Sequence, residues 1–113
     1  MTRNEEILRI AIGAKQSVSA VYDGYPRFLC PHMLGQKAGK LNVLCYQFAG
    51  KGSKGEVTTP ATPSDGPSEL WRCMEVEKLK GLEILLEGPW YTCKKHTMSS
   101  SCADKILAEV VWE

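Results

Sequence analysis

The chain has 113 residues, a length that suits one domain with its own hydrophobic core. Its 14 basic and 13 acidic residues give a formal net charge of +1, which excludes a general polyanion-binding surface and restricts any anion site to a local cluster. The sequence contains no apolar run near the roughly 18 residues of a membrane helix and no signal-peptide pattern at its start. We therefore expect one domain over residues 1–113 that is soluble and cytoplasmic and has no membrane partner.

The start of the chain has the pattern of a capped amphipathic helix. Thr2 and Glu5 have the spacing of a capping box, in which each side chain bonds a free backbone N–H of the first turn. Apolar residues then recur at helical intervals: Ile7, Ile10, Ala11 and Ala14. The pattern predicts a helix over about residues 3–14 that covers one side or end of a sheet.

A β-hairpin is predicted around the Asp-Gly pair at residues 23–24. Residues 17–22 alternate in polarity as a strand does, and Asp-Gly favours a type I′ turn because both turn residues need positive φ. The corresponding register pairs Tyr22 with Tyr25, Ala20 with Arg27 and Val18 with Leu29. Arg27 then lies on the same face as Tyr22, whereas a shift by one residue would move it to the other face.

More strands are predicted beyond a polar turn at residues 36–40. Residues 41–48 form a nearly continuous apolar run, which indicates a strand buried on both faces. Residues 49–68 are rich in glycine and proline and predict a long mobile loop. The remaining strands are predicted where residues alternate or are β-branched, over residues 70–76, 81–86 and 106–112.

This order of elements predicts a mainly β protein with an N-terminal helix. One helix followed by five or six short strands with tight turns indicates a small antiparallel barrel or curled sheet over about residues 17–113. Closure of the sheet is the usual way for a domain of this size to avoid exposed strand edges.

The order of motifs resembles the WYL domain. The matching features are the helix, Tyr-x-Gly-x-x-Arg at residues 22–27, Pro31, an apolar strand ending in Leu44-Cys45-Tyr46, Trp71-Arg72 on a later strand, and a leucine-rich stretch over residues 79–82. The resemblance covers roughly residues 5–86 and implies an SH3-like or Sm-like β-barrel of five or six strands. Residues 41–43 are Leu-Asn-Val where the tripeptide that names the family would fall, and the chain carries no helix-turn-helix.

Arg27 and Arg72 are the candidate anion-binding residues. Each lies among apolar neighbours on a predicted strand face, where an arginine needs a carboxylate, carbonyl groups or a bound anion as its partner. A guanidinium group matches a phosphate or a carboxylate in shape and charge. The alternative is that both arginines reach the rim of the barrel or pair with Glu75 and Glu83.

The resemblance extends this pair into a larger polar site. It carries over Tyr22 together with the two arginines, and His32 is added as their neighbour. Tyr22, Tyr46 or Trp71 would stack on a base, as aromatic residues do in proteins that bind single strands. The predicted ligand-binding residues are therefore Arg27, Arg72, Tyr22, His32 and Trp71.

The cysteines and the glycine-rich segment do not indicate a catalytic or metal site. The cysteines are Cys30, Cys45, Cys73, Cys93 and Cys102, without a Cys-x-x-Cys pair, so we expect reduced thiols that are mostly buried. A zinc site from Cys30, His32, Cys93 and His96 is conceivable but lacks a paired-cysteine motif. Residues 50–55 contain glycines and two lysines without the spacing of a phosphate-binding P-loop.

These features predict a non-enzymatic ligand-binding or regulatory module without cofactor or metal. The expected ligand is a nucleotide or single-stranded nucleic acid, and the resemblance implies a separate DNA-binding protein as a partner. The alternative is a protein-interaction or structural accessory module that forms homo-oligomers through an edge of the barrel.

Overall fold

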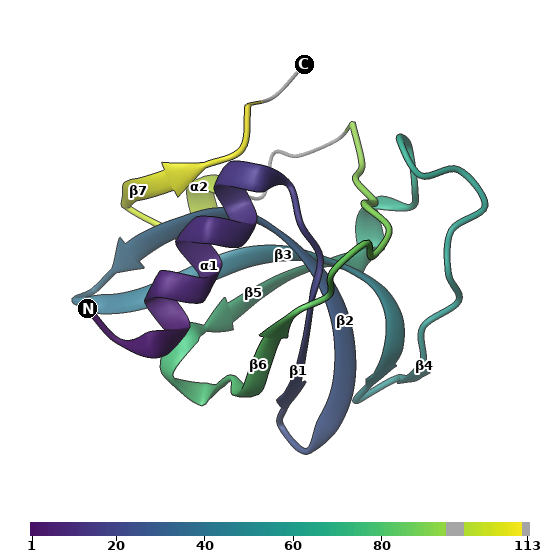
Figure 1. Cartoon of the computed structure of the whole chain (residues 1–113), viewed down its shortest axis with the longest axis horizontal. Helices are drawn as coiled ribbons and strands as arrows, with labels where there is room; N and C mark the ends of the chain where they lie inside the picture. Colours follow the sequence, from purple (N-terminus) through teal and green to yellow (C-terminus); the bar gives the residue numbers. More distant parts are fainter. Residues whose placement is uncertain (95–98, 112–113) are drawn as a thin grey trace.

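A long hairpin of two strands forms the centre of the fold. In the computed structural model, which describes residues 1–94 and 99–111, β2 (Tyr25–Lys37) pairs antiparallel with β3 (Lys40–Gly52) (Figure 1). The turn between them is Ala38-Gly39, and both residues have positive φ, 51° and 80°. This backbone geometry matches the right-handed twist of the two strands, which explains the tight connection.

Shorter strands flank both sides of this hairpin. β1 (Val18–Tyr22) and β7 (Lys105–Glu109) pair with β2, while β4 (Gly55–Glu56) and β5 (Trp71–Glu75) pair with β3. β6 (Lys80–Ile84) pairs with β1 and gives the order β4-β3-β2-β1-β6. The curled antiparallel sheet forms a half-barrel, which confirms the predicted mainly β fold with an N-terminal helix (Figure 1).

The remaining elements are one long helix and three short helical turns. They are α1 (Arg3–Ala14), η1 (Ser68–Leu70), η2 (Val76–Lys78) and α2 (Ser99–Cys102). In the described parts of the chain, no helix is long and apolar enough to cross a membrane.

The predicted hairpin register is confirmed. Tyr22 pairs with Tyr25 and Ala20 with Arg27, and Asp23 and Gly24 have the positive φ values of a type I′ turn, 52° and 80°. The predicted end of the third strand was wrong, because β3 continues through Gly52 instead of ending at residue 48.

The long glycine-rich segment is therefore shorter than predicted. β4 adds a seventh strand inside the range 49–68, and the irregular part covers residues 57–67. Backbone hydrogen bonds hold this part at several points: Val57 N to Gly50 O at 2.9 Å, Thr92 N to Pro63 O at 2.8 Å and Gly66 N to Thr92 O at 3.0 Å. The predicted last strand, 106–112, is observed as β7 but ends earlier, at Glu109. Residues 110 and 111 are irregular, and residue 112 lies outside the described residues.

The helix begins and ends as predicted, but it buries a different face. Thr2 caps it through a hydrogen bond from Glu5 N to Thr2 Oγ1 at 3.2 Å. The buried residues are Leu8, Ala11 and Ile12, whereas Ile10 is 58% exposed. Apolar residues occupy several faces of α1, so periodicity alone did not select one. Asn4 fixes the rotation by donating to the carbonyl groups of Val76 and Leu79, both at 3.0 Å.

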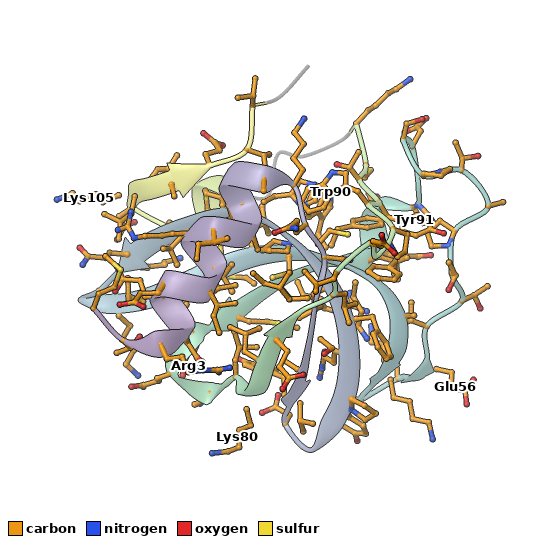
Figure 2. The ribbon with its side chains drawn as sticks, viewed as in Figure 1. Arg3, Glu56, Lys80, Trp90, Tyr91 and Lys105 are labelled. Atoms are coloured by element: carbon orange, nitrogen blue, oxygen red, sulfur yellow. A yellow bond between two sulfur atoms is a disulfide. The ribbon has the colours of Figure 1, made fainter. Side chains whose placement is uncertain are left out.

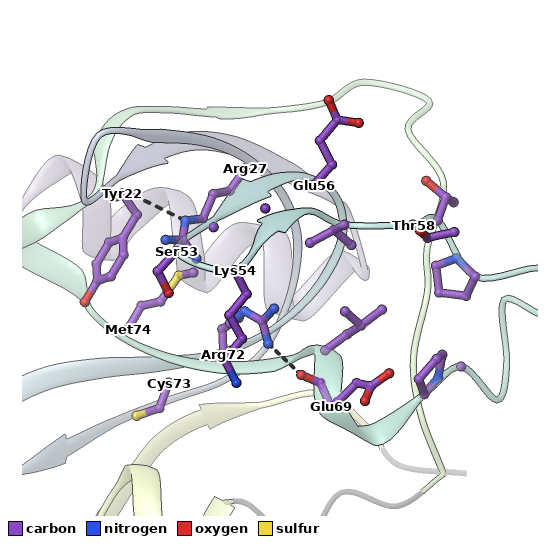
Figure 3. A pocket seen from close by; sticks show the side chains of 18 of the residues that line it. Tyr22, Arg27, Ser53, Lys54, Glu56, Thr58, Glu69, Arg72, Cys73 and Met74 are labelled. Carbon is purple, nitrogen blue, oxygen red and sulfur yellow. Dashed lines mark hydrogen bonds between the residues drawn. The ribbon is translucent and has the colours of Figure 1, made fainter.

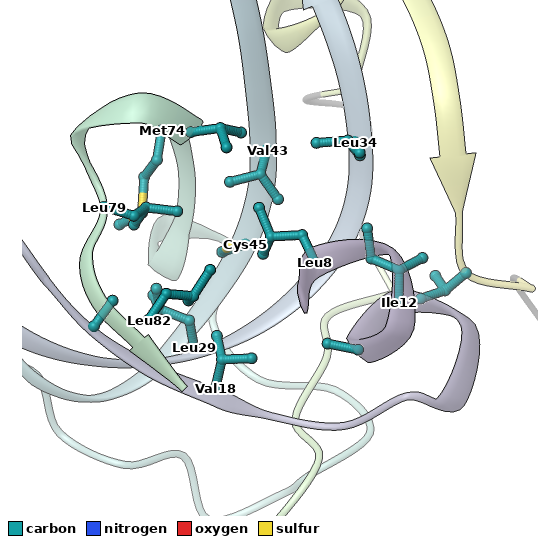
Figure 4. Close-up of a cluster of buried hydrophobic side chains, with 14 residues drawn as sticks. Leu8, Ile12, Val18, Leu29, Leu34, Val43, Cys45, Met74, Leu79 and Leu82 are labelled. Carbon is teal, nitrogen blue, oxygen red and sulfur yellow. The ribbon is translucent and has the colours of Figure 1, made fainter. Parts of the chain in front are cut away.

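The central hairpin separates two hydrophobic cores. The core between the sheet and α1 includes Leu8, Ile12, Val18, Leu29, Leu34, Val43, Met74 and Leu82 (Figure 4). The second core lies on the other face and includes Cys30, Met33, Leu44, Tyr46, Phe48 and Trp71. Side chains of β2 and β3 alternate between the two cores, which confirms the strand that was predicted to be buried on both faces.

The expectation of five reduced cysteines was wrong. Cys73 on β5 and Cys102 at the end of α2 form a disulfide, with Cα atoms 5.6 Å apart. Cys30, Cys45 and Cys93 are free and buried. Burial raises the pKa of the Cys30 thiol to about 12, so this group behaves as an inert apolar residue.

The face of α1 can be tested with two alanine substitutions. Leu8→Ala removes a side chain with no exposed surface and should lower the free energy of unfolding by about 2–5 kcal/mol. Ile10→Ala on the exposed face should change it by no more than about 0.5 kcal/mol. Urea denaturation followed by circular dichroism measures both. Equal losses in the two variants would contradict the observed helix orientation.

Candidate functional site

A cleft of about 900 Å³ lies between the β1–β2 turn, the β3–β4 hairpin, the irregular segment 57–67 and β5 (Figure 3). Three of the predicted site residues line it: Tyr22, Arg27 and Arg72. Lys54 reaches the cleft from the β3–β4 hairpin, and Val57 and Leu70 add apolar surface. Residues from three separate regions of the sequence therefore meet in one hollow.

Arg27 is the buried cation of the cleft. Only 6% of this residue is exposed, although it lines the cleft. Its Nε donates to the Tyr22 carbonyl oxygen at 3.3 Å, and its Nη1 donates to Gln47 Oε1 at 3.2 Å. The guanidinium carbon also lies 5.3 Å from the centre of the Tyr22 ring, a cation–π distance.

Gln47 holds Arg27 through a fixed amide orientation. Its side chain has no exposed surface, and its Nε2 donates to the carbonyl groups of Ala49 and Lys51 at 3.1 and 3.0 Å. Because both amide hydrogens point to backbone oxygens, Oε1 faces Arg27. The arginine is thus held by a neutral group, and its positive charge is not compensated by this contact.

A local irregularity in the central hairpin makes room for this arrangement. The pairing of β2 with β3 shifts between Phe28 and Leu29, where Phe48 is the extra residue of a bulge. Gly50 pairs with Arg27 at a φ of 92°, and a Cβ atom there would lie 2.9 Å from Arg27 Cα. Glycine is therefore required at residue 50 by both conformation and space.

Arg72 supplies a second guanidinium from β5. Its Nη1 donates to the carbonyl groups of Glu69 and Trp71, at 2.6 and 3.2 Å. Burial lowers the pKa of Arg72, the positive charge of Arg27 lowers it further, and Glu69 acts in the opposite direction. The two positive charges therefore repel each other across the cleft.

Neither arginine has an acidic partner in direct contact. Within residues 1–94 and 99–111, no carboxylate oxygen lies within 4.0 Å of either guanidinium group. Of the predicted alternative, the pairing with Glu75 and Glu83 therefore does not occur. Glu75 instead lies near Lys40 and Lys78, at 3.8 and 3.0 Å.

Acidic side chains surround the cleft at its rim. Those that line it are Asp23, Glu56, Asp65 and Glu69, and all four are exposed. Water and salt screen exposed charges more strongly than buried ones. Because the acidic groups are exposed and screened, the less exposed Arg27 and Arg72 dominate the charge at the floor of the cleft, while its entrance carries negative charge.

The structure does not bring His32 and Trp71 into this cleft. They are 1% and 5% exposed and contact each other in the second core, with ring centres 4.7 Å apart. His32 Nδ1 lies 2.7 Å from the Cys30 carbonyl oxygen, and Nε2 lies 2.9 Å from Thr92 Oγ1. Strand alternation explains the separation of Trp71 from its neighbour Arg72, because successive side chains of β5 point to opposite faces.

The conceivable zinc site cannot be assembled from the described residues. No group of three or more potential metal ligands occurs in the part of the chain that the structure describes, and His96 lies outside that part. Cys30 Sγ instead accepts a hydrogen bond from Tyr91 N at 3.2 Å.

Gln47 is the functional residue that the sequence prediction missed. It is a polar side chain between Tyr46 and Phe48 in a strand predicted to be buried on both faces. A buried amide needs hydrogen-bond partners, so this position was a signal of a polar contact across the sheet. Lys54, one of the two lysines in residues 50–55, also lines the cleft.

The chain matches no protein-family model, no curated protein and no solved structure. The resemblance to the WYL domain thus stays a prediction that rests on the residues quoted above. Any assignment of function has to come from the chemistry of the cleft.

The role of Gln47 can be tested by replacing it with methionine, which has a similar shape. Gln47→Met removes the acceptor of Arg27 and leaves the carbonyl groups of Ala49 and Lys51 without their donor. The free energy of unfolding should fall by about 1–3 kcal/mol. The control Gln36→Met, at an exposed position of β2, should change it by no more than about 0.5 kcal/mol. A neutral result for Gln47→Met in urea denaturation would contradict this network.

Proposed function

We propose that the protein is a non-enzymatic binding module whose cleft takes a nucleotide. Arg27 and Arg72 would contact the phosphate groups, and Lys54 at the rim would add a weaker attraction. Val57 and Leu70, which line the cleft, would contact the apolar face of the base or the sugar. A volume of about 900 Å³ is within the usual range of small-molecule pockets.

The observation that carries this proposal is the environment of Arg27. A buried cation is costly unless an opposite charge compensates it. Arg27 has a carbonyl oxygen, a neutral amide and an aromatic ring as neighbours, and no carboxylate within the described residues. A phosphate in the cleft would supply the missing charge, and the planar guanidinium fork suits its oxygens.

The charges at the rim favour a small nucleotide over a long single strand. A polynucleotide would continue past the two arginines and bring its further phosphates near Asp23, Glu56 and Asp65, which line the same cleft. Like charges at the entrance therefore oppose a long polyanion. Of the aromatic residues predicted to stack on bases, Tyr46 and Trp71 are buried in the second core and only Tyr22 lines the cleft.

Charge-preserving and charge-removing substitutions test the arginine pair. Arg72→Gln should raise the dissociation constant for a nucleoside triphosphate roughly tenfold or more, because it removes charge-assisted hydrogen bonds. Arg27→Lys should also weaken binding, because lysine keeps the charge but lacks the planar fork. The control Lys51→Gln removes one exposed charge outside the cleft and should change affinity by no more than about twofold.

Isothermal titration calorimetry with nucleoside mono-, di- and triphosphates measures these effects. Unchanged affinity in both arginine variants would refute the assignment of the site. If no nucleotide binds and light scattering detects a dimer, the alternative of a self-associating accessory module is favoured instead.

The acidic rim provides a separate test of ligand size. We expect a short single-stranded oligonucleotide to bind more weakly than the nucleotide itself, because its additional phosphates meet the rim. Glu56→Gln combined with Asp65→Asn should strengthen oligonucleotide binding and leave nucleotide binding nearly unchanged. Glu83→Gln combined with Glu87→Gln removes two acidic groups that do not line the cleft and should alter neither. Fluorescence anisotropy measures the oligonucleotide, and tighter binding of the oligonucleotide by the native protein would contradict the preference.

A further inference from the structure

The C-terminal segment, residues 99–111, is attached to the sheet by few buried side chains. β7 contains no buried residue, and the buried residues within 101–111 are Cys102, Ala103 and Val110. β7 pairs with β2 over residues 33–36 and has no second strand partner within the described residues. An outer strand with so little burial opens at a low free-energy cost unless something else holds it.

The Cys73–Cys102 disulfide supplies that attachment. It joins the segment to β5, the strand on the opposite side of the central hairpin. Asn42 adds a hydrogen bond from its Nδ2 to the Cys102 carbonyl oxygen at 2.9 Å. The segment therefore crosses the face of β2 and β3 and is fastened at its start by one covalent bond.

We propose that this disulfide is a site of reversible exchange with a low-molecular-weight thiol, and that its opening releases residues 99–111. The inference does not need a bound nucleotide, because it rests on the disulfide and on the packing of the C-terminal segment, although Cys73 is also one of the residues that line the cleft. Opening would leave the edge of β2 over residues 33–36 without its strand partner and would remove Val110 from the core beneath α1.

The two sulfur atoms differ in access, which sets the order of the reaction. Cys73 is an exposed residue, whereas Cys102 has no exposed surface. A thiolate therefore attacks the sulfur of Cys73, the bond between the two cysteines breaks, and Cys102 leaves as a thiolate that takes up a proton. A second thiolate attacks the mixed disulfide on Cys73. Cys73 then becomes a thiol, and the two reagent thiols are oxidised to their disulfide.

The other cysteines do not compete in this reaction. Cys30, Cys45 and Cys93 are free but buried. Burial raises the pKa of both the Cys30 and the Cys45 thiol, so neither forms the reactive thiolate at neutral pH. Exchange is thus restricted to one pair out of the five cysteines.

Thiol labelling of the folded protein tests the site. Oxidised protein is treated with reduced glutathione in the absence of denaturant, free thiols are alkylated, and the adducts are mapped by mass spectrometry. We expect a glutathione adduct on Cys73 first and alkylation of Cys73 and Cys102 after complete reduction. The cysteine variants are treated with oxidised glutathione instead. The Cys73 thiolate of Cys102→Ser should attack its disulfide and keep a stable adduct with release of one reduced glutathione, whereas the matched control Cys73→Ser should show no adduct on the buried Cys102.

Hydrogen exchange tests the release of the segment. Amides of residues 105–110 should exchange roughly tenfold or more faster in the reduced protein and regain protection on reoxidation. Amides of β1 and β3 should change little and serve as the internal control. This measurement uses the native chain, so it can be made even if a cysteine variant fails to fold.

Three results would overturn the proposal. One is a disulfide that resists glutathione until the chain is unfolded. Another is simultaneous labelling of all five cysteines, which would indicate global unfolding. The third is equal exchange of residues 105–110 in the oxidised and reduced forms.

Discussion

The burial of Arg27 beside a neutral partner constrains the whole centre of the fold. A guanidinium group can occupy such a position only when hydrogen-bond acceptors surround it. Gln47 and the Tyr22 carbonyl supply them, and the bulge at Phe48 together with Gly50 brings β2 and β3 into the required geometry. The bulged part of the β2–β3 hairpin is thus the part that holds the Arg27 guanidinium.

Burial of the central hairpin on both faces follows from its place between two cores. α1 covers one face, and on the other face Trp90, Tyr91, Cys93, Cys102 and Ala103 belong to or pack against the second core. A strand of this kind has no solvent face, so each polar residue in it needs a specific partner. His32 and Gln47 both meet this requirement, one in the second core and the other next to the cleft.

Local patterns were sufficient to predict the elements that depend on neighbours in the sequence. The Asp-Gly turn determined the register of β1 and β2, and the Thr2 cap determined the start of α1. The buried face of α1 was not predictable, because contacts of Asn4 with residues 76 and 79 set it. The pairing of Cys73 with Cys102 was also not predictable, since the two residues are 29 positions apart and no spacing rule links them.

The candidate site was predictable only where its residues lie close together in the sequence. Arg27 and Tyr22 share a hairpin, whereas the meeting of Arg27 with Arg72 depends on how β5 pairs with β3. Grouping Trp71 with Arg72 ignored the alternation of a strand, which places the indole in the second core and the guanidinium in the cleft.

The same alternation turns the guanidinium of Arg72 and the disulfide of Cys73 to different sides of β5. β5 presents Arg72 to the cleft and Cys73 to the C-terminal segment, so neighbouring residues serve opposite faces (Figure 3). In Figure 2, Glu56 at the cleft and Lys105 on β7 lie at opposite sides of the molecule. β5 is held on one edge by β3 and on the other by the Tyr22 hydroxyl, which accepts a hydrogen bond from Glu75 N at 3.0 Å. Because two independent contacts fix the strand, opening the disulfide should free the C-terminal segment without displacing Arg72 from the cleft.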